Sequence, residues 1–238
     1  TDVNSAQVVM DRQIEAGADL IKIMATGGSI TPGSRPVDAQ FDEATMVAIV
    51  EQARAKGFKV AAHCHGVSGI HHAAVAGVNT IEHCSWVGPN GWGADYDEGI
   101  AALIAQKGIW VSPTVNSGWR RHIGNANVQK ALATRFSRMR KAGCRLIAST
   151  DAGIPNVWHH ELSSALAVFS VLAGLSNVET LRAATSDCAD AIGLKQETGQ
   201  ITPGLSADLL LCDGNPLQDL TTLQKPVQVF SRGQEQLG

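Results

Sequence analysis

The sequence predicts an α/β fold in which a (β/α) barrel or a doubly wound sheet is followed by a small β-subdomain. Through residues 3–149, short apolar segments alternate with stretches of helical periodicity. Each predicted helix between two strands ends at a glycine, where a left-handed cap is easily formed. After Gly193 the pattern changes to short alternating segments separated by proline and glycine. Parallel strands joined by helices account for the first pattern, and a small β-subdomain accounts for the last.

The first helix is predicted at residues 3–16 and ends at Gly17. Residues 20–24, a short apolar run with a lysine at its centre, predict a buried strand of a parallel sheet. A turn-rich loop follows over residues 25–40, and a second helix is expected from Asp42 to Lys56. The unit then repeats, with strands predicted at 59–63, 80–83, 109–112 and 145–149 and helices at 69–76, 98–106 and 128–141.

The last part of the chain predicts two more helices and then the β-subdomain. The helices are expected at 161–173 and 177–192, and the β-segments at 199–201, 207–212 and 227–230. We therefore predict two domains, a (β/α)-barrel portion with the functional site at residues 1–198 and the small β-subdomain at residues 199–238.

Composition excludes several classes of protein. Hydrophobic residues make up 44% of the 238 residues and charged residues 17%, without a run of about eighteen apolar residues, so neither a membrane span nor disorder is expected. The net charge is −3 and the basic residues are scattered, which disfavours nucleic acid and favours a small-molecule substrate. Five cysteines without C-x-x-C spacing indicate reduced thiols and a cytoplasmic protein. The chain opens without methionine inside a helical pattern, so we expect a processed or truncated polypeptide.

Four polar residues lie in or just after different predicted strands: Lys22, His63, His83 and Asp151. In barrel enzymes the carboxyl ends of the strands hold the active site. An ammonium ion inside an apolar strand is costly to bury, whereas a carbamylated lysine presents a carboxylate that can bridge two cations. Neutral imidazoles suit Zn²⁺, and Asp151 supplies an oxygen ligand that can also accept a proton. The four residues together predict a metal centre for hydrolysis.

Each of these residues also has a structural explanation. A histidine at a strand end is often only hydrogen-bonded, Lys22 could pair with Glu82, and Asp151 could cap the next helix. Four such coincidences at strand ends are less probable than one metal site, so the metal centre is the preferred interpretation.

Six stretches carry a resemblance to a known family. They read GADLIKIMATGG at 17–28, VAAHCHG at 60–66, TIEH at 80–83, STDAG at 149–153, LRAAT at 181–185 and GLSADLL at 204–210. In this order and over nearly the whole chain, the sequence resembles the amidohydrolase superfamily, in the branch of imidazolonepropionase-like and prolidase-like metal-dependent hydrolases. The resemblance implies a TIM-type barrel of the amidohydrolase kind, here truncated to its last five strands, with a small carboxyl-terminal β-subdomain.

The resemblance also implies a role for each site residue. Lys22 is expected to be the carbamylated bridging ligand on the fourth barrel strand, with His63 and His83 as ligands on the fifth and sixth. Asp151, after the eighth strand, is expected to be both a metal ligand and the catalytic base. His65 and His160 are expected to contact the substrate. The first barrel strand of the family carries a His-x-His pair that has no match here, so we expect a homo-oligomer or a complementing amino-terminal chain.

The predicted activity is hydrolysis of a C–N bond in an amide, cyclic amide or dipeptide by metal-activated water. An esterase or lactonase on the same metal site is an alternative, because the attack does not by itself distinguish ester from amide. A second alternative is a catalytically silent truncated barrel that only binds metal and oligomerises. Zn²⁺ is the expected cofactor, and Mn²⁺ or Co²⁺ also suits the ligands.

Overall fold

The computed structural model describes residues 2–236 of the chain. These residues form two compact units. The first unit runs to Pro113 and includes Arg138–Leu146, and the second comprises Thr114–Ser137 and the residues from Ile147 onward. The predicted domain boundary after residue 198 stays a prediction.

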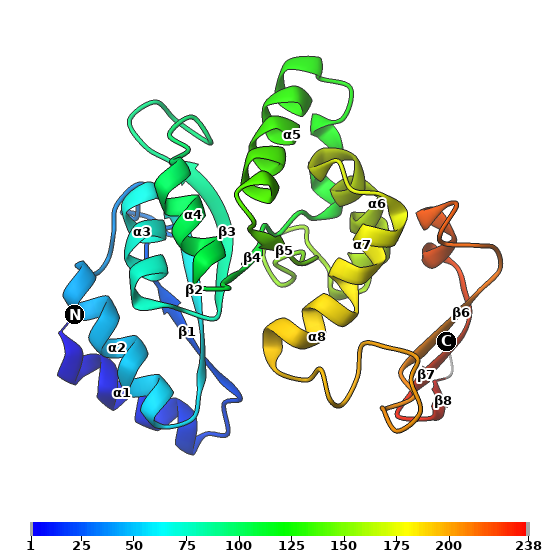
Figure 1. Cartoon of the computed structure of the whole chain (residues 1–238), viewed down its shortest axis with the longest axis horizontal. Helices are drawn as coiled ribbons and strands as arrows, with labels where there is room; N and C mark the ends of the chain where they lie inside the picture. The colour runs from blue at the N-terminus through cyan, green and yellow to red at the C-terminus, as the bar shows by residue number, and fades with distance from the viewer. Residues whose placement is uncertain (1, 237–238) are drawn as a thin grey trace. The chain divides into compact units, whose positions relative to one another are not determined.

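The first unit is built on a five-stranded sheet whose strands lie in chain order, β1-β2-β3-β4-β5 (Figure 1). Each neighbouring pair is parallel, which confirms the predicted α/β fold. A doubly wound sheet reverses its strand order at a switch point, whereas an uninterrupted order matches an arc of a (β/α) barrel. The strands are β1 (Leu20–Met24), β2 (Lys59–Gly66), β3 (Thr80–Val87), β4 (Trp110–Ser112) and β5 (Arg145–Leu146).

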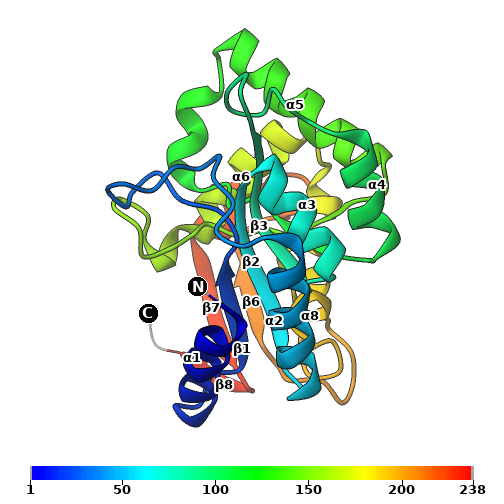
Figure 2. The ribbon, with the colours of Figure 1, turned by 90° about the vertical axis from the view of Figure 1, so that its left-hand side faces the viewer.

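Helices connect the successive strands, and α2 and α3 lie beside β2 (Figure 2). Aspartates begin two of them, since Asp42 accepts a hydrogen bond from the Thr45 amide at 2.8 Å and Asp97 from the Ile100 amide at 2.9 Å. Helix α3 ends at Gly77, whose φ of 74° favours glycine. The helices are α1 (Val3–Glu15), α2 (Glu43–Ala55), α3 (Val67–Ala76), α4 (Glu98–Gln106) and α5 (Ala126–Lys141), the last of which continues from the second unit into the first.

The core of the first unit lies where these helices pack on the sheet. Valine, isoleucine and methionine side chains in this core each contribute about 1.5–3 kcal/mol to the free energy of folding when fully buried. They hold β2 and β3 in a fixed register, and these are the two strands that carry the predicted histidine ligands. The buried residues include Ile21, Ile23, Val60, Ala62 and Ile81 from the strands and Met46, Ile49, Val50, Ile70 and Ala73 from the helices.

Two strand predictions were wrong in detail. Residues 20–24 do form β1, but only Ile21 and Ile23 are buried, while the other three side chains are exposed. The alternation is typical of a strand covered on one face only. The strand expected at 145–149 ends at Leu146, after which the chain enters the second unit.

The second unit contains the three-stranded antiparallel sheet β6-β7-β8, which confirms the predicted small β-sheet at the carboxyl end. Segment 199–201 is not a strand, and β8 was not predicted. The helix expected at 177–192 is two helices, because Thr185 departs from helical geometry at φ −127° and ψ −94°. The elements are η1 (Ser117–His122), η2 (His159–Glu161), α6 (Leu162–Ala173), α7 (Asn177–Ala184), α8 (Ser186–Ile192), β6 (Leu209–Cys212), η3 (Leu220–Gln224), β7 (Pro226–Ser231) and β8 (Gln234–Gln236).

Across residues 2–236, the helices are too short or too polar to span a bilayer.

Candidate metal centre

Three histidine rings meet where β2 and β3 lie side by side. His63 and His65 are two residues apart on β2, so the period of a strand points both side chains to the same face. His83 joins them from β3, where it pairs in register with Cys64. The ring centroids are separated by 4.6 Å for His63 and His65 and by 4.5 Å for the other two pairs. One ligand atom from each ring lies within 4.8 Å of the other two.

A bulge in β3 directs His83 toward this group. The pairing of β2 with β3 shifts register after Cys64, so that Gly66 next pairs with Val87. Within the bulge His83, Cys84 and Trp86 have φ values of 66°, 49° and 54°, in the left-handed region that residues other than glycine seldom adopt. Bulges of this kind re-aim side chains and are frequent beside functional sites.

Neighbouring polar groups orient the rings. The Nε2 atom of His63 lies 3.2 Å from the Gly27 carbonyl oxygen. Since a carbonyl oxygen only accepts, that contact requires the proton on Nε2, and metal binding through Nε2 would break it. The Nδ1 atom of His65 lies 2.9 Å from the Ser85 hydroxyl. Contacts of this type select the tautomer of a metal-binding imidazole.

The environment keeps the imidazoles of His65 and His83 neutral. Burial, followed by the electrostatic interaction with the neighbouring His63, lowers the pKa of His65 to about 4. Burial, followed by the two neighbouring imidazoles and Lys22, lowers the pKa of His83 to about 2. Neutral imidazole is the form that binds a metal ion, so His65 and His83 do not need to lose protons at neutral pH to bind one.

The predicted ligand Lys22 lies on the next strand, β1, where it pairs in register with Ala61. Its side chain is exposed, so the expectation of a buried lysine was wrong. Within residues 2–236 it forms no ion pair with Glu82, whose carboxylate instead accepts a hydrogen bond from Thr80 at 2.6 Å. The structural explanation based on a Lys22–Glu82 pair therefore fails.

The remaining predicted site residues, Asp151 and His160, belong to the second unit. Asp151 is half-buried in the segment after β5, and its φ of 61° is again in the left-handed region. The next helix, η2, has Trp158 as its N-cap residue, so helix capping does not explain Asp151. His160 is exposed within η2. The structure thus brings together His63, His65 and His83, and Asp151 and His160 stay predictions.

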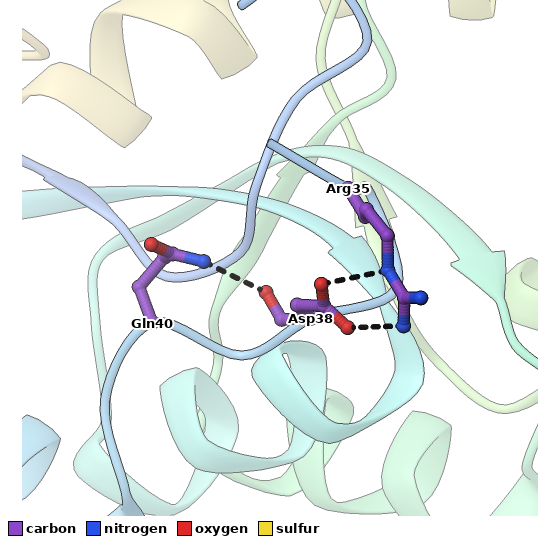
Figure 3. Close-up of polar contacts among 3 residues, drawn as sticks. All are labelled: Arg35, Asp38 and Gln40. Atoms are coloured by element: carbon purple, nitrogen blue, oxygen red, sulfur yellow. Dashed lines mark hydrogen bonds and ion pairs between the residues drawn. The ribbon is translucent and has the colours of Figure 1, made fainter. Parts of the chain in front are cut away.

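The loop between β1 and α2 packs against His63. Gly28 lies so close that a side-chain Cβ there would be 3.7 Å from His63 Nε2. Farther along, the Arg35 guanidinium donates two hydrogen bonds to the Asp38 carboxylate, at 2.8 and 2.7 Å, and the Gln40 amide donates to the Asp38 carbonyl at 3.2 Å (Figure 3). The positive charge of Arg35 and the negative charge of Asp38 therefore compensate each other within the loop.

Two features of the centre were missed at the level of sequence. His65 was expected to contact the substrate or to lie next to the metal ligands, and its ring lies as close to His83 as that of His63 does. The signal was its spacing from His63, because alternate residues of a strand share a face. A separate group of possible ligands, Glu43, His71 and His72, was not anticipated and lies on α2 and α3.

Comparisons with known sequences agree with the predicted family. The sequence profile of the amidohydrolase family matches residues 5–235. Ochratoxinase from Aspergillus niger is 29% identical over 221 residues, which cover 91% of this chain and 45% of the ochratoxinase. Imidazolonepropionase from Mesorhizobium japonicum is 28% identical over 216 residues, covering 84% of this chain and 47% of that protein. The chain therefore spans about half the length of these curated relatives.

Solved structures are similar to nearly the whole chain. A Xaa-Pro dipeptidase with methionine bound in its active site has a TM-score of 0.83 at 26% identity, with 100% of this chain and 59% of that chain covered. A prolidase complexed with N-methylphosphonate-L-proline has a TM-score of 0.82 at 28% identity, with 99% and 59% covered.

Proposed function

Because the chain belongs to the amidohydrolase family, we propose that it carries the metal centre of a hydrolase that cleaves C–N bonds in an amide, a cyclic amide or a dipeptide. The observation that carries this proposal is the group of three imidazoles, His63, His65 and His83, on neighbouring parallel strands. The names of related proteins, an imidazolonepropionase and a Xaa-Pro dipeptidase among them, support the same reaction class.

The donor set fits a divalent cation, and Zn²⁺ is the proposed one. Neutral imidazole nitrogens are ligands that Zn²⁺ prefers, and the short separation of the rings suits one ion. His63 and His83 would hold the metal, with Asp151 and carbamylated Lys22 as oxygen ligands. Bound there, the ion would lower the pKa of water toward neutrality and polarise the carbonyl of the scissile bond. Mn²⁺ and Co²⁺ suit the same ligands.

Carbamylation would change the charge that Lys22 presents to the histidines. The ammonium group first loses one proton. The neutral amine then attacks carbon dioxide, an N–C bond forms as one C–O π bond opens, and a second proton leaves the nitrogen, so a cation becomes an anion. The exposed position of Lys22 leaves its amine accessible to carbon dioxide. At present its positive charge contributes to the lowered pKa of His83, which means that the two groups interact electrostatically. An anion in its place would attract a cation held by His83.

The other proposed residues act on protons and on the substrate. Asp151 would accept a proton from the attacking water and deliver it to the leaving amine, as a general acid and base. His65 would contact the substrate through Nε2, because its Nδ1 atom already contacts Ser85. His160 is the second proposed substrate contact.

Metal content and hydrolysis of purified variants test this function. His63→Ala and His83→Ala should each lose the tightly bound metal and any hydrolysis of a dipeptide, a cyclic amide and an ester with the same acyl group. His122→Ala is the matched control, because it removes a histidine that belongs to neither group of possible metal ligands among the described residues. Unchanged metal content in both His63 and His83 variants would contradict the proposal. Turnover of the ester without either amide would favour the esterase.

The predicted cytoplasmic location and the predicted homo-oligomer or complementing amino-terminal chain also stay proposals. Exposed apolar side chains on α1 and β1 support a partner at this edge of the sheet, because a strand edge with apolar neighbours tends to pair. Light scattering at several protein concentrations measures the molar mass in solution. The mass of a monomer at every concentration would contradict the proposed oligomer. The exposed side chains are Val8, Val9, Leu20 and Met24.

A further inference from the structure

The loop between β3 and α4 carries an exposed tryptophan beside the candidate metal centre. The Trp92 side chain is 59% exposed, although its ring centroid lies 5.0 Å from that of His65 at an angle of 68°. The His65 ring in turn stacks on His83, with an interplanar angle of 26°. The indole therefore lies beside the centre rather than in a core.

Both ends of this loop are anchored in the first unit. Trp86, before the loop, is fully buried, and Tyr96, near the end of the loop, packs against it with ring centroids 4.7 Å apart. The guanidinium of Arg138 lies over the Tyr96 ring at 4.1 Å. These contacts hold the two ends of the loop together, so that its middle part projects from a rigid base.

The middle of the loop is a tight turn with defined hydrogen bonds. The Gly91 amide donates to the Gly88 carbonyl at 3.1 Å. The Asp95 carboxylate accepts hydrogen bonds from the backbone and side-chain amides of Asn90, at 3.1 and 2.7 Å. Gly91 and Gly93, on either side of Trp92, have φ values of 104° and 73°, which glycine adopts without strain. The turn therefore determines where the indole lies.

Apolar side chains also follow the neighbouring strand. Met24, at the end of β1, pairs in register with His63 and is 49% exposed. Ile30 is 63% exposed in the loop whose Gly28 packs on His63. The charges of Arg35 and Asp38 in that loop pair with each other. Met24 and Ile30 thus add exposed apolar side chains to the segments that adjoin His63, next to the charged Lys22.

We propose that Trp92 is a specificity-determining residue that packs against a flat apolar ring of the substrate. This inference rests on the proposed function and names its substrate class as amides with an aromatic group next to the scissile bond. An indole offers a large flat face with little loss of side-chain entropy, and aromatic pairs prefer stacked or edge-to-face contacts. Its contact with His65 places such a ring beside the centre at which the bond would be cleaved.

Binding of two phosphonates to the zinc-loaded protein tests the inference without requiring turnover. Benzylphosphonate and methylphosphonate share the charged group and differ in the ring, so calorimetry isolates what the ring contributes. The unmodified protein should bind the benzyl compound about tenfold more tightly, and Trp92→Ala should remove that preference while Trp92→Phe retains most of it. Val178→Ala, which truncates an exposed apolar residue on α7, is the control. Equal binding of both compounds by the unmodified protein, or equal losses in Trp92→Ala, would overturn the inference.

Hydrolysis separates this inference from the function on which it rests. The ratio of kcat/KM for N-acetyl-L-phenylalanine over N-acetylglycine should fall about tenfold in Trp92→Ala, with metal content unchanged. If both amides are hydrolysed and the ratio does not change, ring recognition by Trp92 is wrong and the hydrolase stands. If neither is hydrolysed but the phosphonate preference depends on Trp92, the recognition of the ring is supported and the proposed function fails.

Discussion

Replacing His83 by glycine should separate the stability of the strand from the stability that a metal adds. His83 has a φ of 66° in the bulge of β3, a conformation that glycine adopts freely and other residues do not. The replacement therefore removes the proposed ligand and relieves backbone strain at the same time. Alanine at this position would remove the ligand but keep the strain.

The magnitudes follow from the local contacts. Glycine in the left-handed conformation removes the backbone strain of a residue with a Cβ, which is about 1–2 kcal/mol. Glycine costs about 0.5–1 kcal/mol in backbone entropy. The lost stacking of the ring on His65 costs about 0.5–1.5 kcal/mol. The relief and the losses nearly cancel. The free energy of unfolding of the metal-free variant should therefore differ from that of the metal-free unmodified protein by no more than about 1.5 kcal/mol. Metal at one hundred times its dissociation constant should add about 2.7 kcal/mol to the unmodified protein and nothing to the variant.

Urea unfolding with and without Zn²⁺, followed by tryptophan fluorescence, measures both terms. Arg232→Gly is the matched control, because Arg232 also has a positive φ, 52°, in the turn between β7 and β8. It should keep the full response to Zn²⁺. A His83→Gly protein that is still stabilised by Zn²⁺, or one that loses stability like a truncated core residue, would refute the reasoning.

Two further predictions concern packing and pH. In Gly66→Ala the new Cβ would lie 2.6 Å from the Val37 carbonyl oxygen, so the loop after β1 must move. We expect urea unfolding to show a free energy of unfolding lower by about 1–3 kcal/mol. An unchanged urea midpoint would show that the loop moves without cost. The pKa of Asp208 is lowered, first by the hydrogen bond from the Arg232 amide. A lowered pKa means that the folded state is stabilised above the unfolded pKa and loses this stabilisation as pH falls through the folded value. Asp208→Ala should therefore speed hydrogen exchange in β6 and β7 at pH 7 and weaken its acid dependence, whereas identical exchange profiles would contradict this role.

Local patterns in the sequence were sufficient for most elements. The bounds of β1 and α4 agree with those predicted, because short apolar runs and glycine stops act over a few residues. The positions of His63 and His83 on adjacent parallel strands follow from the same patterns, since parallel strands joined by helices align their carboxyl ends. The family resemblance, carried by the motifs around these residues, was confirmed by the profile match.

By itself the sequence determined the order of strands and helices, the family and the strands that carry the histidines, because these depend on residues close together in the chain. Only the tertiary structure decided that His65 joins His63 and His83, that Lys22 is exposed, and that Trp92 lies against His65. The grouping of the three histidines depends on the register between β2 and β3 and on the bulge with its positive φ values, and the exposure of Lys22 depends on which face of β1 is covered. Register and bulge are set by packing between segments far apart in the chain, for which no local periodicity carries a signal.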